Sequence, residues 1–258
     1  MMYAPLLQSP KTGVIVTGGA SGLGLASARA LAAVGRPVAL WDINEAGATQ
    51  AAEEIKRTFA VASVGLRVDL RDPQAIAPAA AASRDAMGTI GGVLHSAGTV
   101  EMTGIEGVTV ANWDSGINVH VRALVLLVQA VLQDLKAHPG SAVVAVASIN
   151  ATLGAGSIPI YTAAKSAILG LVRSMADELG RDNIRINAVS PGVIDTPIIE
   201  PALKVVSREQ FERRIQLGRL GRAEEVGRLV RFLLSDEASY ITAAQIVIDG
   251  GNLTSQRH

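Results

Sequence analysis

The most constraining feature of this chain is a regular alternation of short apolar runs with longer helix-forming stretches. The runs are rich in β-branched residues and lie at 13–17, 37–42, 66–69, 92–95, 142–146, 184–189 and 245–248. Several are apolar at nearly every position, which is typical of parallel strands that are covered on both faces. Parallel pairing needs crossover connections of the length found here. The pattern therefore predicts an α/β fold with a parallel sheet of about seven strands and helices on both faces.

The stretches between the runs are rich in alanine, leucine, glutamate and arginine. They predict helices at 22–34, 45–58, 73–87, 112–137, 158–180 and 222–235. No linker, charge block or internal repeat divides the chain, so we expect one domain over residues 1–258. The segment 197–217 breaks the rhythm with two prolines and a polar stretch, and we expect a lid-like excursion there.

Charge and cysteine content exclude several classes of protein. The 23 basic and 23 acidic residues cancel, so no excess positive charge favours a nucleic acid partner. Cysteine is absent, which excludes disulfides and thiolate chemistry and is consistent with a reducing compartment. No apolar run approaches the roughly 18 residues of a membrane span, and the first residues lack the pattern of a signal peptide. We expect a cytoplasmic protein without a membrane partner.

A glycine-rich turn, Thr-Gly-Gly-Ala-Ser-Gly-Leu-Gly at 17–24, joins the first run to the first predicted helix. Glycines let the backbone approach a pyrophosphate, and the free N–H groups of the helix start then face the anion. The same cluster alone also fits an ordinary turn. Asp42 ends the second run about 20 residues downstream, where a carboxylate can bind both ribose hydroxyls of an adenosine. An N-cap or turn residue is the alternative interpretation of Asp42.

A second set of polar residues follows the fifth run. Tyr161 and Lys165 are four residues apart on a predicted helix and therefore share a face. Ser148 ends the preceding strand. An adjacent ammonium favours the phenolate form of a tyrosine, so this set could transfer a proton at a carbonyl or alcohol. The Tyr-to-Lys spacing is also common on solvated helices.

Taken together, these motifs resemble those of the classical short-chain dehydrogenase/reductase family over nearly the whole chain. The shared marks are the glycine turn at 17–24, Asp69-Leu70, Ala97-Gly98, Asn118, Ser148, Tyr161, Lys165, Asn187, Pro191-Gly192, Thr196 and Asp249-Gly250-Gly251. The resemblance implies a single Rossmann-type doubly wound domain, a nicotinamide cofactor and hydride transfer.

The resemblance also implies roles for individual residues. Tyr161 would be the acid/base, and Lys165 would lower its pKa and bind the nicotinamide ribose. Ser148 would bind the substrate oxygen, and Asn118 would hold a water that links Lys165 to solvent. Asp69 and Leu70 would contact adenine, while Ile194 and Thr196 would anchor the carboxamide. The full set of implied cofactor contacts is Gly18, Ser21, Gly22, Leu23, Gly24, Asp42, Asp69, Leu70, Ala97, Gly98, Tyr161, Lys165, Pro191, Gly192, Ile194 and Thr196.

One motif departs from the family pattern. The chain has His95-Ser96-Ala97-Gly98 where the family usually shows Asn-Asn-Ala-Gly. We expect His95 to be structural rather than a base or a metal ligand. The other histidines, His120, His138 and His258, show no ligand spacing, so no metal is expected. Asp195 is expected to be a turn residue rather than a catalytic acid.

These observations predict an NAD-dependent oxidoreductase that interconverts an apolar secondary alcohol and a ketone. NAD is expected over NADP, because the Asp42 carboxylate would repel a 2′-phosphate and no cation precedes or follows it closely. A non-catalytic cofactor-binding regulator and a dehydratase or epimerase with the same site are the alternatives. Long apolar faces on two predicted helices, together with the resemblance, predict a homotetramer. The residues named for those faces are Leu124, Leu126, Leu127, Val131, Ile168, Leu171 and Val172.

Overall fold

A seven-stranded parallel sheet forms the centre of the protein. The computed structural model describes residues 5–256, and its strands follow the order β3-β2-β1-β4-β5-β6-β9. Their bounds are β1 Gly13–Thr17, β2 Val38–Asp42, β3 Ser63–Arg67, β4 Ile90–His95, β5 Ala142–Val146, β6 Arg185–Pro191 and β9 Gln245–Ile248. The order reverses between β1 and β4, and ligands of open α/β sheets bind at such a switch point. The predicted fold class is confirmed.

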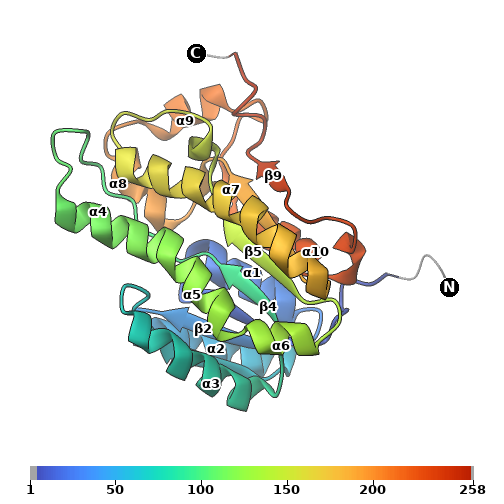
Figure 1. Cartoon of the computed structure of the whole chain (residues 1–258). Helices are drawn as coiled ribbons and strands as arrows, with labels where there is room; N and C mark the ends of the chain where they lie inside the picture. Colours follow the sequence, from blue (N-terminus) through green and yellow to red (C-terminus); the bar gives the residue numbers. More distant parts are fainter. Residues whose placement is uncertain (1–4, 257–258) are drawn as a thin grey trace.

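Helices cover both faces of this sheet. They are α1 Gly22–Ala32, α2 Glu45–Phe59, α3 Ile76–Met87, α4 Val110–Ile117, α5 Ala123–Ala130, α6 Leu132–Ala137, α7 Pro159–Leu179, α8 Glu200–Leu203, α9 Arg208–Arg214 and α10 Ala223–Leu233. One buried apolar cluster joins the sheet to α3, α5 and α7, and a second joins it to α1, α2 and α10. Figure 1 shows α4, α5 and α7 in front of the strands. Among the described residues, no helix has the length and apolar character needed to cross a bilayer.

The third strand begins earlier than the sequence predicts. It spans Ser63–Arg67 rather than 66–69, and it pairs with β2 from Val38 onward. Gly65 explains the error, because a Cβ there would lie 2.4 Å from the Ala48 carbonyl of α2. The helix crosses the strand so closely that only glycine fits, although glycine is depleted in strands generally.

The helix predicted over 112–137 is interrupted twice. A π-helix, Asn118–Arg122, separates α4 from α5, and the Ala123 N–H donates to the Asn118 carbonyl. Val131 leaves helical geometry between α5 and α6. Helix α4 is capped by Thr109 in a capping box with Asn112. It therefore begins two residues before the start predicted for this helix. Such π-bulges are frequent at functional sites and are not visible in apolar periodicity.

The lid-like segment 197–217 contains a 3₁₀ turn, α8 and α9. Strand β7, Ile194–Asp195, precedes this segment and β8, Gly221–Arg222, follows it. The two short strands pair in parallel. Asp195 is therefore a strand residue rather than a turn residue, and its exposed carboxylate forms a 3.0 Å ion pair with Arg208. Arg213 and Arg214 lie exposed on α9.

The helix faces that suggested a tetramer are largely used within one subunit. Five of the named residues are buried by the chain's own packing: Leu124, Leu127, Val131, Ile168 and Val172. Leu126 and Leu171 are partly buried against the same core. These residues cover the sheet, so this part of the argument for a tetramer does not hold and the resemblance alone supports it.

Candidate active site

The glycine turn forms a tight cradle between β1 and α1. Gly18 and Gly22 have positive φ angles of 68° and 50°, which disfavour other residues. A Cβ on Gly24 would lie 2.1 Å from the Gly18 carbonyl oxygen, and one on Gly18 would lie 3.0 Å from the Ala97 Cα. Ser21 is the N-cap of α1, and its side chain caps no helix N–H group. The cradle therefore has the close approach and the free helix start that a pyrophosphate group needs.

The Asp42 carboxylate lies beside this cradle. Its Oδ2 accepts from the Ala20 N–H at 3.0 Å, and its Oδ1 accepts from the Asn44 N–H at 2.9 Å. Asn44, not Asp42, is the N-cap of α2. The N-cap interpretation of Asp42 is therefore wrong. Its carboxylate binds the turn at 42–44 and also orients the glycine turn.

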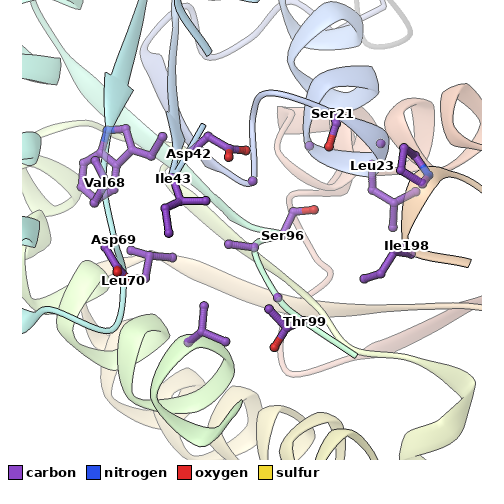
Figure 2. A pocket seen from close by; sticks show the side chains of 18 of the residues that line it. Ser21, Leu23, Asp42, Ile43, Val68, Asp69, Leu70, Ser96, Thr99 and Ile198 are labelled. Carbon is purple, nitrogen blue, oxygen red and sulfur yellow. The ribbon is translucent and has the colours of Figure 1, made fainter. Parts of the chain in front are cut away.

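A cleft of about 360 Å³ opens along the carboxyl ends of the strands. Eleven of the predicted cofactor residues line it: Gly18, Ser21, Gly22, Leu23, Gly24, Asp42, Asp69, Leu70, Ala97, Gly98 and Thr196. Figure 2 shows Asp42, Ile43 and Asp69 toward one end, and Ser21, Leu23 and Ile198 toward the other. The other predicted contacts do not line this cleft: Tyr161, Lys165, Pro191, Gly192 and Ile194.

Sequence reasoning missed part of the cleft wall. The additional lining residues include Trp41, Ile43, Arg71, Ser96, Thr99, Ser115 and Val119. Arg71 binds both carboxylate oxygens of Asp69, at 2.7 to 3.2 Å, and these hydrogen bonds hold the Asp69 pKa below its ordinary value. The Asp-x-Arg spacing was the available signal for this pair. Ile43 is 54% exposed and follows Asp42 directly. This neighbourhood in sequence could have identified it as an apolar part of the cleft wall.

Ser148, Tyr161 and Lys165 lie close together beyond the carboxyl end of β5. Ser148 is buried at the N-cap of a 3₁₀ turn, where its Oγ accepts from the Asn150 N–H at 3.1 Å. Tyr161 and Lys165 lie on the first two turns of α7, and the Lys165 Nζ is 5.4 Å from the Tyr161 ring centroid. Lys165 is only 4% exposed, and its Nζ donates to the Val146 carbonyl at 2.6 Å.

Burial controls the protonation of this group. It lowers the pKa of Lys165 to about 7 and raises the pKa of Tyr161, while a hydrogen bond with Ser148 acts in the opposite direction on Tyr161. Low dielectric surroundings disfavour both the ammonium and the phenolate. At neutral pH Tyr161 is therefore a neutral phenol, and Lys165 is close to half-protonated, so its ammonium form is available beside the tyrosine ring.

His95 is structural, as the sequence analysis predicts. It is 1% exposed, and its Nδ1 lies 3.1 Å from the Thr17 Oγ1. That hydroxyl oxygen already accepts from the Ser96 and Ala97 N–H groups, so its own proton points to His95. The His95 Nε2 then carries the proton and donates to the His120 carbonyl at 3.1 Å. Burial lowers the pKa of His95 to about 4, consistent with this neutral form.

The remaining predicted residues have clear positions. Asn118 is half-buried at the start of the π-helix. Asn187 is fully buried and binds the Ile241 carbonyl and the Ala244 N–H, so it fixes the loop before β9. His258 lies outside the described residues. Within residues 5–256, no three His, Cys, Asp or Glu side chains gather where they could hold a metal ion.

Known proteins resemble this chain in sequence over nearly its whole length. Residues 18–252 match the family model described as Enoyl-(Acyl carrier protein) reductase. Levodione reductase of Leifsonia aquatica is 36% identical over 247 residues, with 92% of each chain covered. A 3-alpha-(or 20-beta)-hydroxysteroid dehydrogenase of Mycobacterium tuberculosis is 32% identical, with 95% of this chain and 90% of the relative covered.

Solved structures agree closely in fold. A crystal structure of levodione reductase superposes with a TM-score of 0.88 at 34% identity, covering 95% of this chain and 98% of the other. L-sorbose reductase from Gluconobacter frateurii, solved with NADPH and L-sorbose, gives a TM-score of 0.89 at 27% identity and covers 95% and 97%. Together with the glycine cradle and the Ser148, Tyr161 and Lys165 group, these matches show that the chain belongs to the short-chain dehydrogenase/reductase family of oxidoreductases.

Proposed function

We propose that this oxidoreductase is NAD-dependent and interconverts a secondary alcohol and a ketone, with Tyr161 as the acid/base. The observation that carries the proposal is the convergence of Ser148, Tyr161 and Lys165 at the sheet edge where the glycine cradle opens. When bound, the nicotinamide cofactor supplies the acceptor or donor of the hydride. The cradle residues would hold its pyrophosphate, and Asp42 its adenosine ribose.

The protein's own groups supply the proton transfer. Tyr161 takes the alcohol proton in oxidation and returns a proton to the carbonyl oxygen in reduction. Because burial raises its pKa, the phenolate needs positive charge nearby, and the Lys165 ammonium supplies it. Ser148 donates a hydrogen bond to the substrate oxygen as charge develops. Such acid–base assistance is worth about 10²–10⁴ in rate.

NAD is proposed over NADP because of the charges at the adenosine end of the cleft. The Asp42 carboxylate would face a 2′-phosphate, and two anions in a partly buried site repel. Arg71 also lines the cleft, but Asp69 already binds its guanidinium. Cofactor choice differs among relatives, since L-sorbose reductase was solved with NADPH. The proposal therefore rests on Asp42 in this chain.

The substrate is proposed to be an apolar secondary alcohol or ketone. Ile149 follows Ser148 directly and Leu153 follows the same 3₁₀ turn, and Pro197 and Ile198 of the lid-like segment line the cleft. We propose that residues 197–217 close over the site, starting from a position held by the Asp195–Arg208 ion pair. Hydrogen exchange checks this: protection in 197–217 should rise when NAD is added, and unchanged protection would contradict closure.

The decisive assay follows reduced nicotinamide absorbance with NAD and with NADP. The panel would hold apolar cyclic and open-chain secondary alcohols, a ketose and a charged hydroxy acid. We expect turnover with NAD and an apolar alcohol, and a relative gain of about tenfold or more in NADP use by Asp42→Ala. Wild-type preference for NADP would overturn the cofactor assignment.

The same assay separates the alternatives. Cofactor binding without turnover on any substrate would favour a regulator, and loss of water or inversion without net change in nicotinamide would favour a dehydratase or epimerase. We also propose a homotetramer, on the resemblance alone. Light scattering checks it, and a monomer mass near the 26.7 kDa of one chain would contradict it.

A further inference from the structure

His120 lies in the centre of the π-helix and packs against the catalytic tyrosine. It is 1% exposed, and its ring meets that of Tyr161 edge to face, with centroids 5.7 Å apart and planes at 82°. Aromatic pairs favour this geometry, because the positive edge of one ring faces the negative face of the other. The contact links α7 to the π-helix beside the proposed site of proton transfer.

The same imidazole binds the loop that follows β4. Its Nε2 lies 3.2 Å from the Thr99 N–H nitrogen and 2.9 Å from the Thr99 carbonyl oxygen. A Cβ on Gly98 would lie 2.1 Å from the His120 Cε1, so the ring packs directly against the backbone of this loop. Thr99 and Gly98 both line the cofactor cleft. His120 therefore bridges the cleft wall and the Tyr161 ring.

Burying an imidazole at this position costs free energy of folding. Its Nδ1 is buried and has no hydrogen-bond partner among the described residues. Burial, together with the charge of Lys165, holds the pKa of His120 well below its ordinary value, so the ring is neutral. An apolar side chain would fill the space without an unsatisfied nitrogen. Packing alone does not explain the residue, whereas the combination of ring contact and Thr99 bond does.

We propose that His120 is a positioning residue, which holds the Tyr161 ring in register with the Thr99 loop and hence with the cofactor cleft. The inference rests on the proposed role of Tyr161. Proton transfer requires the phenol oxygen to stay within hydrogen-bond reach of the substrate, and small misplacements of a catalytic group can lower rates about 10²-fold. A side chain that keeps only the ring or only the polar group would supply half of this restraint.

Two variants of His120 separate the ring contact with Tyr161 from the hydrogen bond with Thr99. His120→Phe keeps a ring against Tyr161 but loses the Thr99 bond, and His120→Gln keeps a polar group but loses the ring. For each we expect kcat to fall about 10–100-fold, with the KM and Kd for NAD within about twofold of wild type. His138→Gln is the matched control, since His138 follows α6 at the opposite end of the sheet, and it should leave kcat unchanged. Thermal unfolding and NAD binding identify any variant that fails to fold, and the other variant then carries the test.

The double-mutant cycle with Tyr161→Phe is the critical measurement, made under single-turnover conditions. If His120 acts through Tyr161, either His120 variant should lower the residual rate of Tyr161→Phe by less than about twofold. A full 10–100-fold further loss, or wild-type kcat in both single variants, would overturn the positioning role. Normal turnover in Tyr161→Phe alone would instead overturn the proposed function, so the two failures are distinguishable.

Discussion

Two buried cations lie at opposite edges of the same sheet, and their hydrogen bonding differs. Arg36 precedes β2 at the amino edge, is fully buried, and donates to the Thr12 carbonyl, the Thr12 Oγ1 and the Leu234 carbonyl at 2.6 to 3.2 Å. Lys165 lies at the carboxyl edge and is almost as deeply buried. Among the described residues, its ammonium has one acceptor, the Val146 carbonyl.

The difference in bonding has a counterpart in protonation. Burial lowers the Arg36 pKa to about 10, with Asp236 acting in the opposite direction, so Arg36 stays charged at neutral pH. Burial lowers the Lys165 pKa to about 7, and within residues 5–256 no carboxylate acts in the opposite direction on it. In the arginine that supports the fold, each of the three guanidinium nitrogens has an acceptor. The cation at the proposed active site keeps donors free and titrates near neutrality, as groups at functional sites often do.

Replacing the lysine should give the largest effect. Lys165→Met removes the charge that we propose favours the Tyr161 phenolate, so we expect kcat to fall about 10²–10⁴-fold. The free energy of unfolding should stay unchanged or rise by about 1–4 kcal/mol, because a desolvated charge is replaced by an apolar chain. Steady-state kinetics and urea unfolding measure both, and a large loss of stability would contradict the comparison.

Replacing Arg36 should lower stability and leave kcat unchanged, the reverse of the result expected for Lys165. Arg36→Met leaves the Thr12 and Leu234 carbonyls without their donor, and we expect unfolding to become easier by about 3–5 kcal/mol. The kcat of the folded fraction at 25 °C should match wild type, since Arg36 lies at the edge remote from the cleft. Loss of kcat in the folded variant would show that the two edges are coupled.

A smaller effect should appear in the pH dependence of stability. The folded-state pKa of Lys165, about 7, lies below its unfolded value of about 10.4. Between these values the unfolded chain binds more protons, so the lysine's contribution to stability rises with pH, by at most about 1.4 kcal/mol per unit. In urea unfolding from pH 7 to 10, the free energy of unfolding of wild type should therefore rise relative to that of Lys165→Met. Parallel curves would contradict the lowered pKa.

Much of the arrangement around these two cations can be predicted from the sequence. The position of Arg36 far from the site follows from the sequence, because a residue that precedes a parallel strand lies at the end of the sheet opposite the ligands. Continuous apolar runs predicted the sheet, and spacing predicted the glycine cradle, Asp42 and the Tyr161–Lys165 pair. Each of these features is determined by residues that are close together in the sequence.

What escaped prediction depends on contacts between distant segments. Gly65 pairs with Leu40 of β2, and only glycine fits there because α2 crosses it closely. The π-helix at 118–122 carries no periodic signature. His120 looked like a scattered histidine, because the partners that give it a role, Thr99 and Tyr161, are about 20 and 40 residues away in sequence. The state of Lys165 likewise follows from burial, which spacing does not reveal.

The most direct test of the account is the turnover of Tyr161→Phe. This change removes one oxygen and keeps the ring that packs against His120, so fold and NAD binding should match wild type. We predict that kcat falls about 10³-fold or more, since the acid/base is lost while the cofactor cleft remains intact. Turnover within about tenfold of wild type, with NAD still bound, would contradict the assignment of Tyr161 as the acid/base.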